Sequence, residues 1–129
     1  MSQPVVFDID GTLTAEPYND ENIGRVKENP AMVFVAKTLQ ESSPLVISTA
    51  RSEKWRAETE KWLKGHGLSP KAVYMRDESR EQAADQMIKF GHLKDIREKF
   101  GDPTVWIDDN PANVNMLRRN DVPVIHVKQ

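Results

Sequence analysis

The chain has 129 residues, which suits one compact domain and is short for two. Its 18 basic and 20 acidic residues give a net charge of −2, which excludes a strongly basic module that binds nucleic acid through its overall field. The absence of cysteine excludes disulfides and thiolate chemistry and fits a reducing compartment. Apolar runs are far shorter than the roughly 20 residues of a membrane-spanning helix, and the N-terminus lacks a signal-peptide pattern, so we expect a cytoplasmic protein with no membrane partner.

Prolines mark the starts of five short apolar runs. Proline is tolerated at the first residue of a strand and not inside a central strand, so each run is predicted to be a strand. The runs do not alternate apolar with polar residues, which is typical of strands covered on both faces of a parallel sheet. In chain order, the expected strands follow Pro4, Pro44, Pro70, Pro103 and Pro123.

Helical patterns lie between these runs. Ser52 and Asn110 are expected to cap helices, and Asn110 is followed by a proline suited to the first helical position. A glycine at position 91 is expected to interrupt the third helix. The expected helices cover about residues 32–39, 53–64, 84–100 and 111–119.

Strand and helix alternate along the chain, which predicts an α/β fold with a doubly wound, Rossmann-like sheet of five parallel strands. We expect a single domain over residues 1–129, with the polar stretch 13–29 forming a flap within it. The sequence leaves the oligomeric state open.

The residues that end the apolar runs are expected to meet at one edge of the sheet, because ligands bind there in open α/β folds. Side chains alternate along a strand, so the two aspartates after the first run point to the same side. A glycine directly after them permits a sharp turn. The residues gathered at this edge are Asp8, Asp10 and Gly11 after the first run, Thr49 and Arg51 after the second, and Asp108 and Asp109 after the fourth.

Four carboxylates at one edge indicate phosphoryl-transfer chemistry. Like charges this close are costly unless a cation neutralises them, and carboxylate oxygens are the ligands that Mg²⁺ prefers. One carboxylate can attack phosphorus to give an aspartyl-phosphate. A second can protonate the leaving oxygen and later activate water, while the metal and a lysine spread the charge of the transferring group.

Residues 8–14, which read DIDGTLT, resemble the first motif of the haloacid dehalogenase (HAD) phosphohydrolase superfamily. A hydroxyl, a lysine and an acidic pair then follow in that superfamily's order. More narrowly, the chain resembles the 3′-phosphatase domains of bacteriophage polynucleotide kinase-phosphatases. This similarity rests on TAR at 49–51, on Asp85 four residues before Lys89, and on IDD at 107–109 leading into NMLRR at 115–119. It implies a HAD-like fold without a cap domain.

The resemblance also implies a role for each matching residue. Asp8 is implied to be the nucleophile and Asp10 the general acid and base, and both are implied to bind Mg²⁺, Asp10 through its backbone carbonyl. The resemblance further implies that Thr49 and Lys89 hold the phosphate, that Arg51 is functional, and that Asp109 ligates the metal with support from Asp108. Thr12 and Arg51 are expected to bind substrate. Because Arg51 begins the segment after the second strand, we expect its side chain at the mouth of the site rather than on its floor. The implied reaction is removal of 3′-phosphates from nucleic acid ends or nucleotides.

Two departures from the pattern of the phage enzymes and three alternative functions accompany this interpretation. Phage enzymes carry an arginine shortly after the first motif, but residues 13–22 contain none, and the sequence has no glycine-rich kinase loop. A 5′-nucleotidase or a small-molecule HAD phosphatase is therefore an alternative function.

A phospho-receiver signalling domain is an alternative from another class of protein. It also has an acidic site on such a sheet, with its phosphorylated aspartate after the third strand. Asp77 follows the third run here, but receivers place their acidic pair after the first strand, whereas Asp108 and Asp109 come late.

Overall fold

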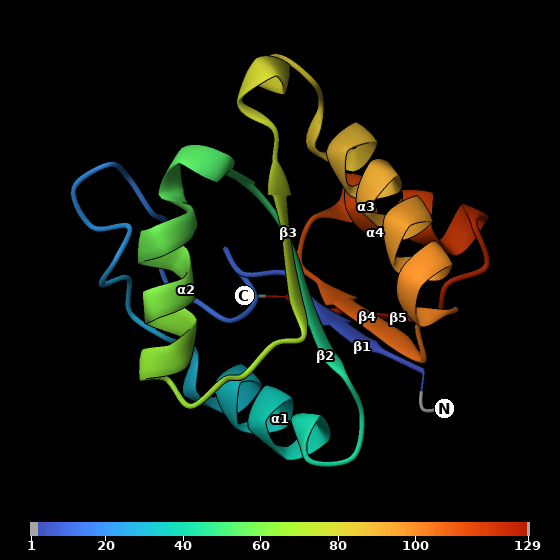
Figure 1. Ribbon diagram of the computed structural model, residues 1–129, viewed down its shortest axis with the longest axis horizontal. Helices are drawn as coiled ribbons and strands as arrows, with labels where there is room; N and C mark the ends of the chain where they lie inside the picture. Colours follow the sequence, from blue (N-terminus) through green and yellow to red (C-terminus); the bar gives the residue numbers. More distant parts are fainter. Residues whose placement is uncertain (1–2, 129) are drawn as a thin grey trace.

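The computed structural model describes residues 3–128, and their backbone alternates strictly between strand and helix (Figure 1). Every strand begins one or two residues after one of the five prolines singled out in the sequence, which confirms the predicted strand starts. In chain order the elements are β1 (Val5–Phe7), α1 (Pro30–Gln40), β2 (Leu45–Ser52), the 3-10 turn η1 (Glu53–Trp55), α2 (Arg56–Gly65), β3 (Ala72–Arg76), the 3-10 turn η2 (Glu78–Arg80), α3 (Asp85–Phe100), β4 (Val105–Asp108), α4 (Pro111–Arg119) and β5 (Val124–His126).

All strand pairs in the sheet are parallel, and the strand order is β3-β2-β1-β4-β5. The chain builds outward from β1 to β3, then crosses back to place β4 on the other side of β1. The strand order thus reverses between β1 and β4, and a ligand-binding crevice forms at such a switch point in doubly wound folds. The predicted doubly wound, five-stranded α/β sheet is confirmed, and residues 3–128 contain no cap domain.

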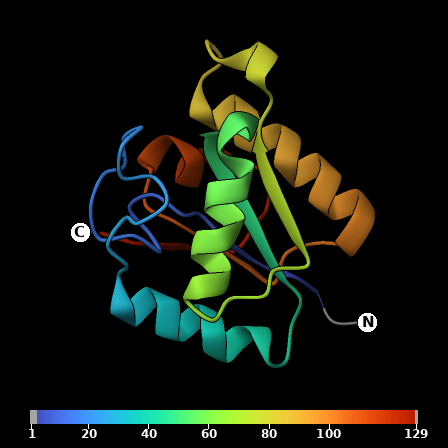
Figure 2. The ribbon, with the colours of Figure 1, turned by 60° about the vertical axis from the view of Figure 1, so that its left-hand side comes forward.

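Helices cover both faces of the sheet (Figures 1 and 2). On one face, α1 and α2 pack against Val5 and Phe7; on the other, α3 and α4 pack against Val6 and Trp106. Neighbouring residues of β1 therefore enter different cores, as the two-residue period of a strand requires. This explains why the strands are apolar without alternation. None of the helices within residues 3–128 is both long and apolar enough to cross a membrane.

The expected break of the third helix at Gly91 is wrong, because α3 runs without interruption from Asp85 to Phe100. A glycine inside a helix costs about 1 kcal/mol relative to alanine. That cost is offset by the burial of Leu93 and Ile96 against the sheet, at about 1.5–3 kcal/mol for each such side chain. Tertiary packing therefore outweighs the local preference.

The capping predictions have different outcomes. Asn110 accepts hydrogen bonds from the backbone N–H groups of Ala112 and Asn113 and caps α4 as expected. Ser52 is instead the last residue of β2 and caps the short turn η1, so that α2 begins only at Arg56.

Residues 13–29 form an irregular loop that is anchored near its base and exposed at its tip. The side chains of Ile23 and Val26 are buried, and the indole N–H of Trp62 donates to the carbonyl oxygen of Val26 at 2.7 Å. The tip, residues 15–21, is exposed. The loop is therefore packed onto α2 at one end and free to meet a ligand at the other.

His92 joins helix α3 to two strands of the sheet. Its Nε2 lies 3.0 Å from the carbonyl oxygen of Met75, and its Nδ1 lies 2.8 Å from the hydroxyl of Ser48. Because a carbonyl can only accept, Nε2 carries the proton and Nδ1 accepts from Ser48. Burial lowers the pKa of His92 to about 4, so the ring is neutral at physiological pH.

This buried imidazole predicts a specific loss of stability in acid. The unfolded chain binds a proton at His92 near its ordinary pKa of 6.5, but the folded chain does so only near 4. The contribution of the neutral His92 ring to the free energy of unfolding is therefore complete above about pH 6.5. It falls as the pH drops toward 4, by about 3 kcal/mol in all. Urea unfolding at pH 7, 5.5 and 4 should show the free-energy gap between wild type and His92→Gln narrowing. A gap that stays constant over this range would contradict the prediction.

Candidate functional site

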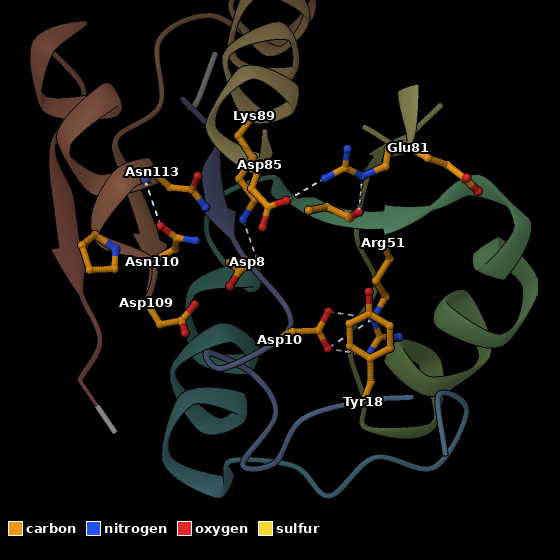
Figure 3. A pocket seen from close by; sticks show the side chains of 13 residues that line it. Asp8, Asp10, Tyr18, Arg51, Glu81, Asp85, Lys89, Asp109, Asn110 and Asn113 are labelled. Carbon is orange, nitrogen blue, oxygen red and sulfur yellow. Dashed lines mark hydrogen bonds and ion pairs between the residues drawn. The ribbon is translucent and has the colours of Figure 1, made fainter. Parts of the chain in front are cut away.

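A cavity of about 430 Å³ opens at the carboxyl ends of β1, β2 and β4, beside the switch point of the sheet (Figure 3). Its side chains come from segments far apart in the sequence, which the parallel strands bring to one edge. They include Asp8 and Asp10 after β1, Tyr18 from the 13–29 loop, Arg51 from β2, Arg76 from β3, Asp85 and Lys89 from α3, and Asp109 and Asn113 after β4.

Lys89 reaches from α3 to the ends of two strands and binds a carboxylate on each. Its Nζ lies 2.5 Å from Asp8 Oδ1 and 2.7 Å from Asp108 Oδ2, and all three side chains are buried. Burial alone would lower the pKa of Lys89, but the two carboxylates overcome this and raise it above its ordinary value. Lys89 is therefore a permanent positive charge on the floor of the cavity.

Asp8 is held on its second oxygen as well. The hydroxyl of Thr12 donates to Asp8 Oδ2 at 3.1 Å. Thr12, predicted to bind substrate, is itself fully buried, so the structure places it behind Asp8 as a support. Burial raises the pKa of Asp8 well above its ordinary value, opposed by the charge of Lys89 and reinforced by that of Asp108. A further positive charge beside Asp8 would lower that pKa and so favour the carboxylate.

Gly11 makes the turn after Asp10 possible for two reasons. Its φ of 83° lies in the left-handed region, which side chains disfavour by about 1–2 kcal/mol. A Cβ atom at this position would also overlap the carboxylate of Asp109. The glycine therefore allows the first motif and the acidic pair after β4 to approach each other.

Three of the four predicted acidic residues form one cluster. Asp8, Asp108 and Asp109 each place a carboxylate oxygen within 4.8 Å of the others. With Lys89, these three carboxylates leave two negative charges, which a divalent cation balances. Asn113 donates through Nδ2 to Asp108, while its Oδ1 is buried and has no hydrogen-bond partner among the described residues. Charge and oxygen donors together fit Mg²⁺.

The carboxylate of Asp10 does not join this cluster; it forms an ion pair with Arg51 instead. Nε of Arg51 lies 2.9 Å from Asp10 Oδ2, and Nη2 lies 2.8 Å from Oδ1. This two-pronged contact matches the planar guanidinium to both carboxylate oxygens. Any contact of Asp10 with the metal is thus left to its backbone carbonyl.

Arg51 was expected at the mouth of the site, and the structure corrects that position. The side chain is buried, donates also to the hydroxyl of Thr59 at 3.1 Å, and lies beneath the ring of Tyr18, 4.9 Å from its centroid. Arg51 therefore forms an inner wall of the cavity. Its contacts with Asp10 and Thr59 hold it there even without a bound phosphate.

Thr49, predicted to hold phosphate, lies one residue before the lining of the cavity. Its side chain is buried and its hydroxyl oxygen accepts from the backbone N–H of Arg51 at 3.2 Å. The lining from β2 comes from Ala50 and Arg51. Ala50 and Arg51 thus contribute to the lining and Thr49 does not, while the Thr49 hydroxyl binds the backbone of β2 two residues further on.

Arg76 and Asp85 build the far wall of the cavity and pair with each other at 2.6 Å. The guanidinium of Arg76 also donates to the backbone carbonyls of Ala50, Arg80 and Ala83. Arg76 therefore fixes the loop between β3 and α3 against β2, and with it the start of the helix that carries Lys89.

Tyr18 and Asn113 are among several lining residues that were not predicted as site residues from the sequence. Tyr18 lies in a polar loop without periodicity, where a single aromatic residue was the only signal. Asn113 lies in the first turn of α4, and its spacing of five residues from Asp108 was the available signal. Both could be placed only once the backbone was known.

Comparisons with known proteins agree with this fold. The family described as the polynucleotide kinase PNKP phosphatase domain matches residues 2–129. A chain in the structure of the Pnkp1/Rnl/Hen1 RNA repair complex is similar, with a TM-score of 0.86 and 23% identity over 98% of this chain and 42% of that one. A second structure of the Pnkp1/Rnl/Hen1 complex gives a TM-score of 0.83 and 24% identity over 98% of this chain and 46% of that one.

A more distant likeness is found in a haloacid dehalogenase-like hydrolase from Streptococcus pneumoniae, with a TM-score of 0.66 and 13% identity over 98% of this chain and 85% of that one. Among curated proteins, none matches the chain in sequence. The chain spans less than half the length of the repair-complex chains it resembles. Because the family match extends over nearly all of its residues, the chain belongs to the PNKP phosphatase-domain family, a group of HAD-type hydrolases.

Proposed function

We propose that this chain hydrolyses phosphomonoesters through an aspartyl-phosphate on Asp8, removing 3′-phosphates from nucleic acid ends or from nucleotides. The observation that carries the proposal is the setting of Asp8. Its carboxylate faces the cavity and is fixed by Lys89 and Thr12 beside a cluster suited to a divalent cation. Family membership and the repair complex among the similar structures support a nucleic acid substrate.

The proposed reaction has two steps that use the same pair of aspartates. An oxygen of Asp8 attacks phosphorus, the bond from phosphorus to the leaving oxygen breaks, and Asp10 gives that oxygen a proton. Water then attacks the phosphorus of the aspartyl-phosphate and gives a proton to Asp10. Inorganic phosphate leaves and the Asp8 carboxylate is restored, with Asp10 again holding the proton. Without substrate Asp10 is instead paired with Arg51 as a carboxylate, so it takes up this proton when substrate binds.

The remaining residues stabilise charge and hold position. Lys89 places its ammonium beside Asp8, where negative charge accumulates on the transferring phosphoryl group. Asp8, Asp109 and the backbone carbonyl of Asp10, with Asp108 in support, would hold a divalent cation, which would supply the positive charge that lets an anionic phosphate approach a carboxylate. Arg51 fixes the carboxylate of Asp10 at the cavity wall through two hydrogen bonds.

Access to the site favours a polymer end. Residues 3–128 carry no cap domain over the cavity, so the end of a strand can reach Asp8. With a net charge of −2, attraction to a polyanion must come from a few local cations near the cavity. We therefore expect modest affinity for long polymers and a shallow dependence of binding on salt.

A phosphate-release panel tests the proposal. The substrates are 3′-phosphorylated oligonucleotides, 5′-phosphorylated oligonucleotides and nucleoside 3′- and 5′-monophosphates, each with Mg²⁺ and with a chelator. We expect release from the 3′-phosphates with Mg²⁺ and loss of nearly all activity after chelation. Efficient cleavage of 5′-monophosphates with every 3′-phosphate ignored would replace this function by that of a 5′-nucleotidase.

A further inference from the structure

We infer that the tip of the 13–29 loop forms a subsite for the nucleobase of the terminal nucleotide, with the ring of Tyr18 as its stacking surface. The inference rests on the proposed function, because it assigns a place to the base whose 3′-phosphate lies at Asp8. Tyr18 itself has no part in the proposed chemistry.

A second cavity lies directly beside the first. Its volume is about 360 Å³, within the range of roughly 300–1,000 Å³ usual for small-ligand sites. It shares Asp10, Tyr18 and Asp109 with the phosphate cavity, so the two cavities adjoin at these side chains. A nucleotide with its phosphate at Asp8 can therefore extend along Asp10 toward the loop.

Tyr18 stands at the boundary of the two cavities with one face supported. The guanidinium of Arg51 lies 4.9 Å from the ring centroid, and Arg51 is itself fixed by Asp10 and Thr59 (Figure 3). The tyrosine is nevertheless 38% exposed, so part of it stays open to a ligand. Burial, with the charge of Asp10, raises the pKa of Tyr18, which keeps the phenol neutral. The ring is thus held in place before any ligand arrives.

The lining of the second cavity suits a flat, uncharged group. Ala15, Pro17 and the Tyr18 ring supply apolar surface, and the carboxylates of Asp10, Glu16 and Asp109 surround it. Asp10 is paired with Arg51 and Asp109 is assigned to the metal, which leaves the carboxylate of Glu16 to disfavour a second phosphate but not a neutral base. An aromatic platform stacks any base, because every base has a π-face. We therefore expect a preference for a base at this position with little preference among bases.

Two 3′-phosphorylated oligonucleotides that differ only in the last residue, a normal nucleoside or an abasic one, test the subsite. Stacking on one aromatic ring is worth about 1–3 kcal/mol, or roughly 5- to 150-fold. We expect wild type to favour the base-bearing substrate by about tenfold in kcat/KM. The ratio should fall to near one in Tyr18→Ala and stay within about threefold of wild type in Tyr18→Phe.

Phe34 provides a matched control, since it is an aromatic residue on α1 that is 69% exposed and lies outside both cavities. Phe34→Ala should leave both rates and their ratio unchanged. Binding gives a readout without turnover: in an Asp8→Asn background, fluorescence of a terminal 2-aminopurine should be quenched by the protein, and Tyr18→Ala should remove most of the quenching.

The outcomes separate the two proposals. Equal rates of wild type on the two oligonucleotides, or an equal loss on both in Tyr18→Ala, would overturn the base subsite while leaving the 3′-phosphatase function in place. Retained quenching in Tyr18→Ala would also overturn it. Absence of phosphate release from either oligonucleotide, with release from other phosphomonoesters, would remove the proposed function and the subsite together.

Discussion

Replacement of Asp8 by Asn is expected to stop phosphate release while the protein stays folded. An amide is not a competent nucleophile, so the rate should fall by at least about 10³-fold. The fold should survive because Asn removes a buried charge, and Lys89 keeps its ion pair with Asp108. The rate is measured by phosphate release from a 3′-phosphorylated oligonucleotide, and folding by circular dichroism and urea unfolding.

Asp102→Asn is the matched control for this variant. Asp102 is an exposed aspartate that pairs with Arg97, away from the residues that line the cavity. Its replacement should leave the rate unchanged and alter the free energy of unfolding by about 0.5 kcal/mol or less. An Asp8→Asn variant that is well folded and keeps more than about a hundredth of the wild-type rate would exclude Asp8 as the nucleophile.

Local sequence signals identified the strands and much of the site. Proline excludes the interior of a central strand, so Pro4, Pro44 and Pro123 mark strand starts that survive in the structure. Parallel strands share one carboxyl edge, so residues that end different strands had to meet there. Asp8 and Asp108 do so, and Lys89 bridges them.

The direction of individual side chains at that edge could not be predicted from spacing. The sequence placed Asp10 with the other carboxylates, but its side chain pairs with Arg51, whose partner depends on how β2 sits beside β1. Tyr18 reaches the cavity from a loop whose path is set by packing of Ile23 and Val26, not by any local pattern. The predicted break at Gly91 was wrong for a related reason: the burial of Leu93 and Ile96 against the sheet outweighs the low helix propensity of glycine.

Lys89→Met is expected to remove activity and to destabilise the fold at the same time. Methionine retains most of the length of the side chain but leaves the buried carboxylates of Asp8 and Asp108 facing each other without a cation. Removing one partner from a buried ion pair costs about 3–5 kcal/mol. The loss of a charge beside the transferring phosphoryl group should lower the rate by at least about 10²-fold.

A second substitution separates the two effects. Lys89→Met/Asp108→Asn removes one of the two unpaired charges, so it should recover part of the free energy of unfolding without restoring phosphate release.

Lys94→Met serves as the control, because Lys94 is an exposed lysine on the same helix. This substitution should change the free energy of unfolding by no more than about 0.5 kcal/mol. The penalty in Lys89→Met should shrink as the pH falls, because protonation neutralises a stranded carboxylate. The prediction would be wrong if Lys89→Met unfolded at the same urea concentration as wild type at every pH tested. That result would show that Lys89 does not balance the charges of Asp8 and Asp108.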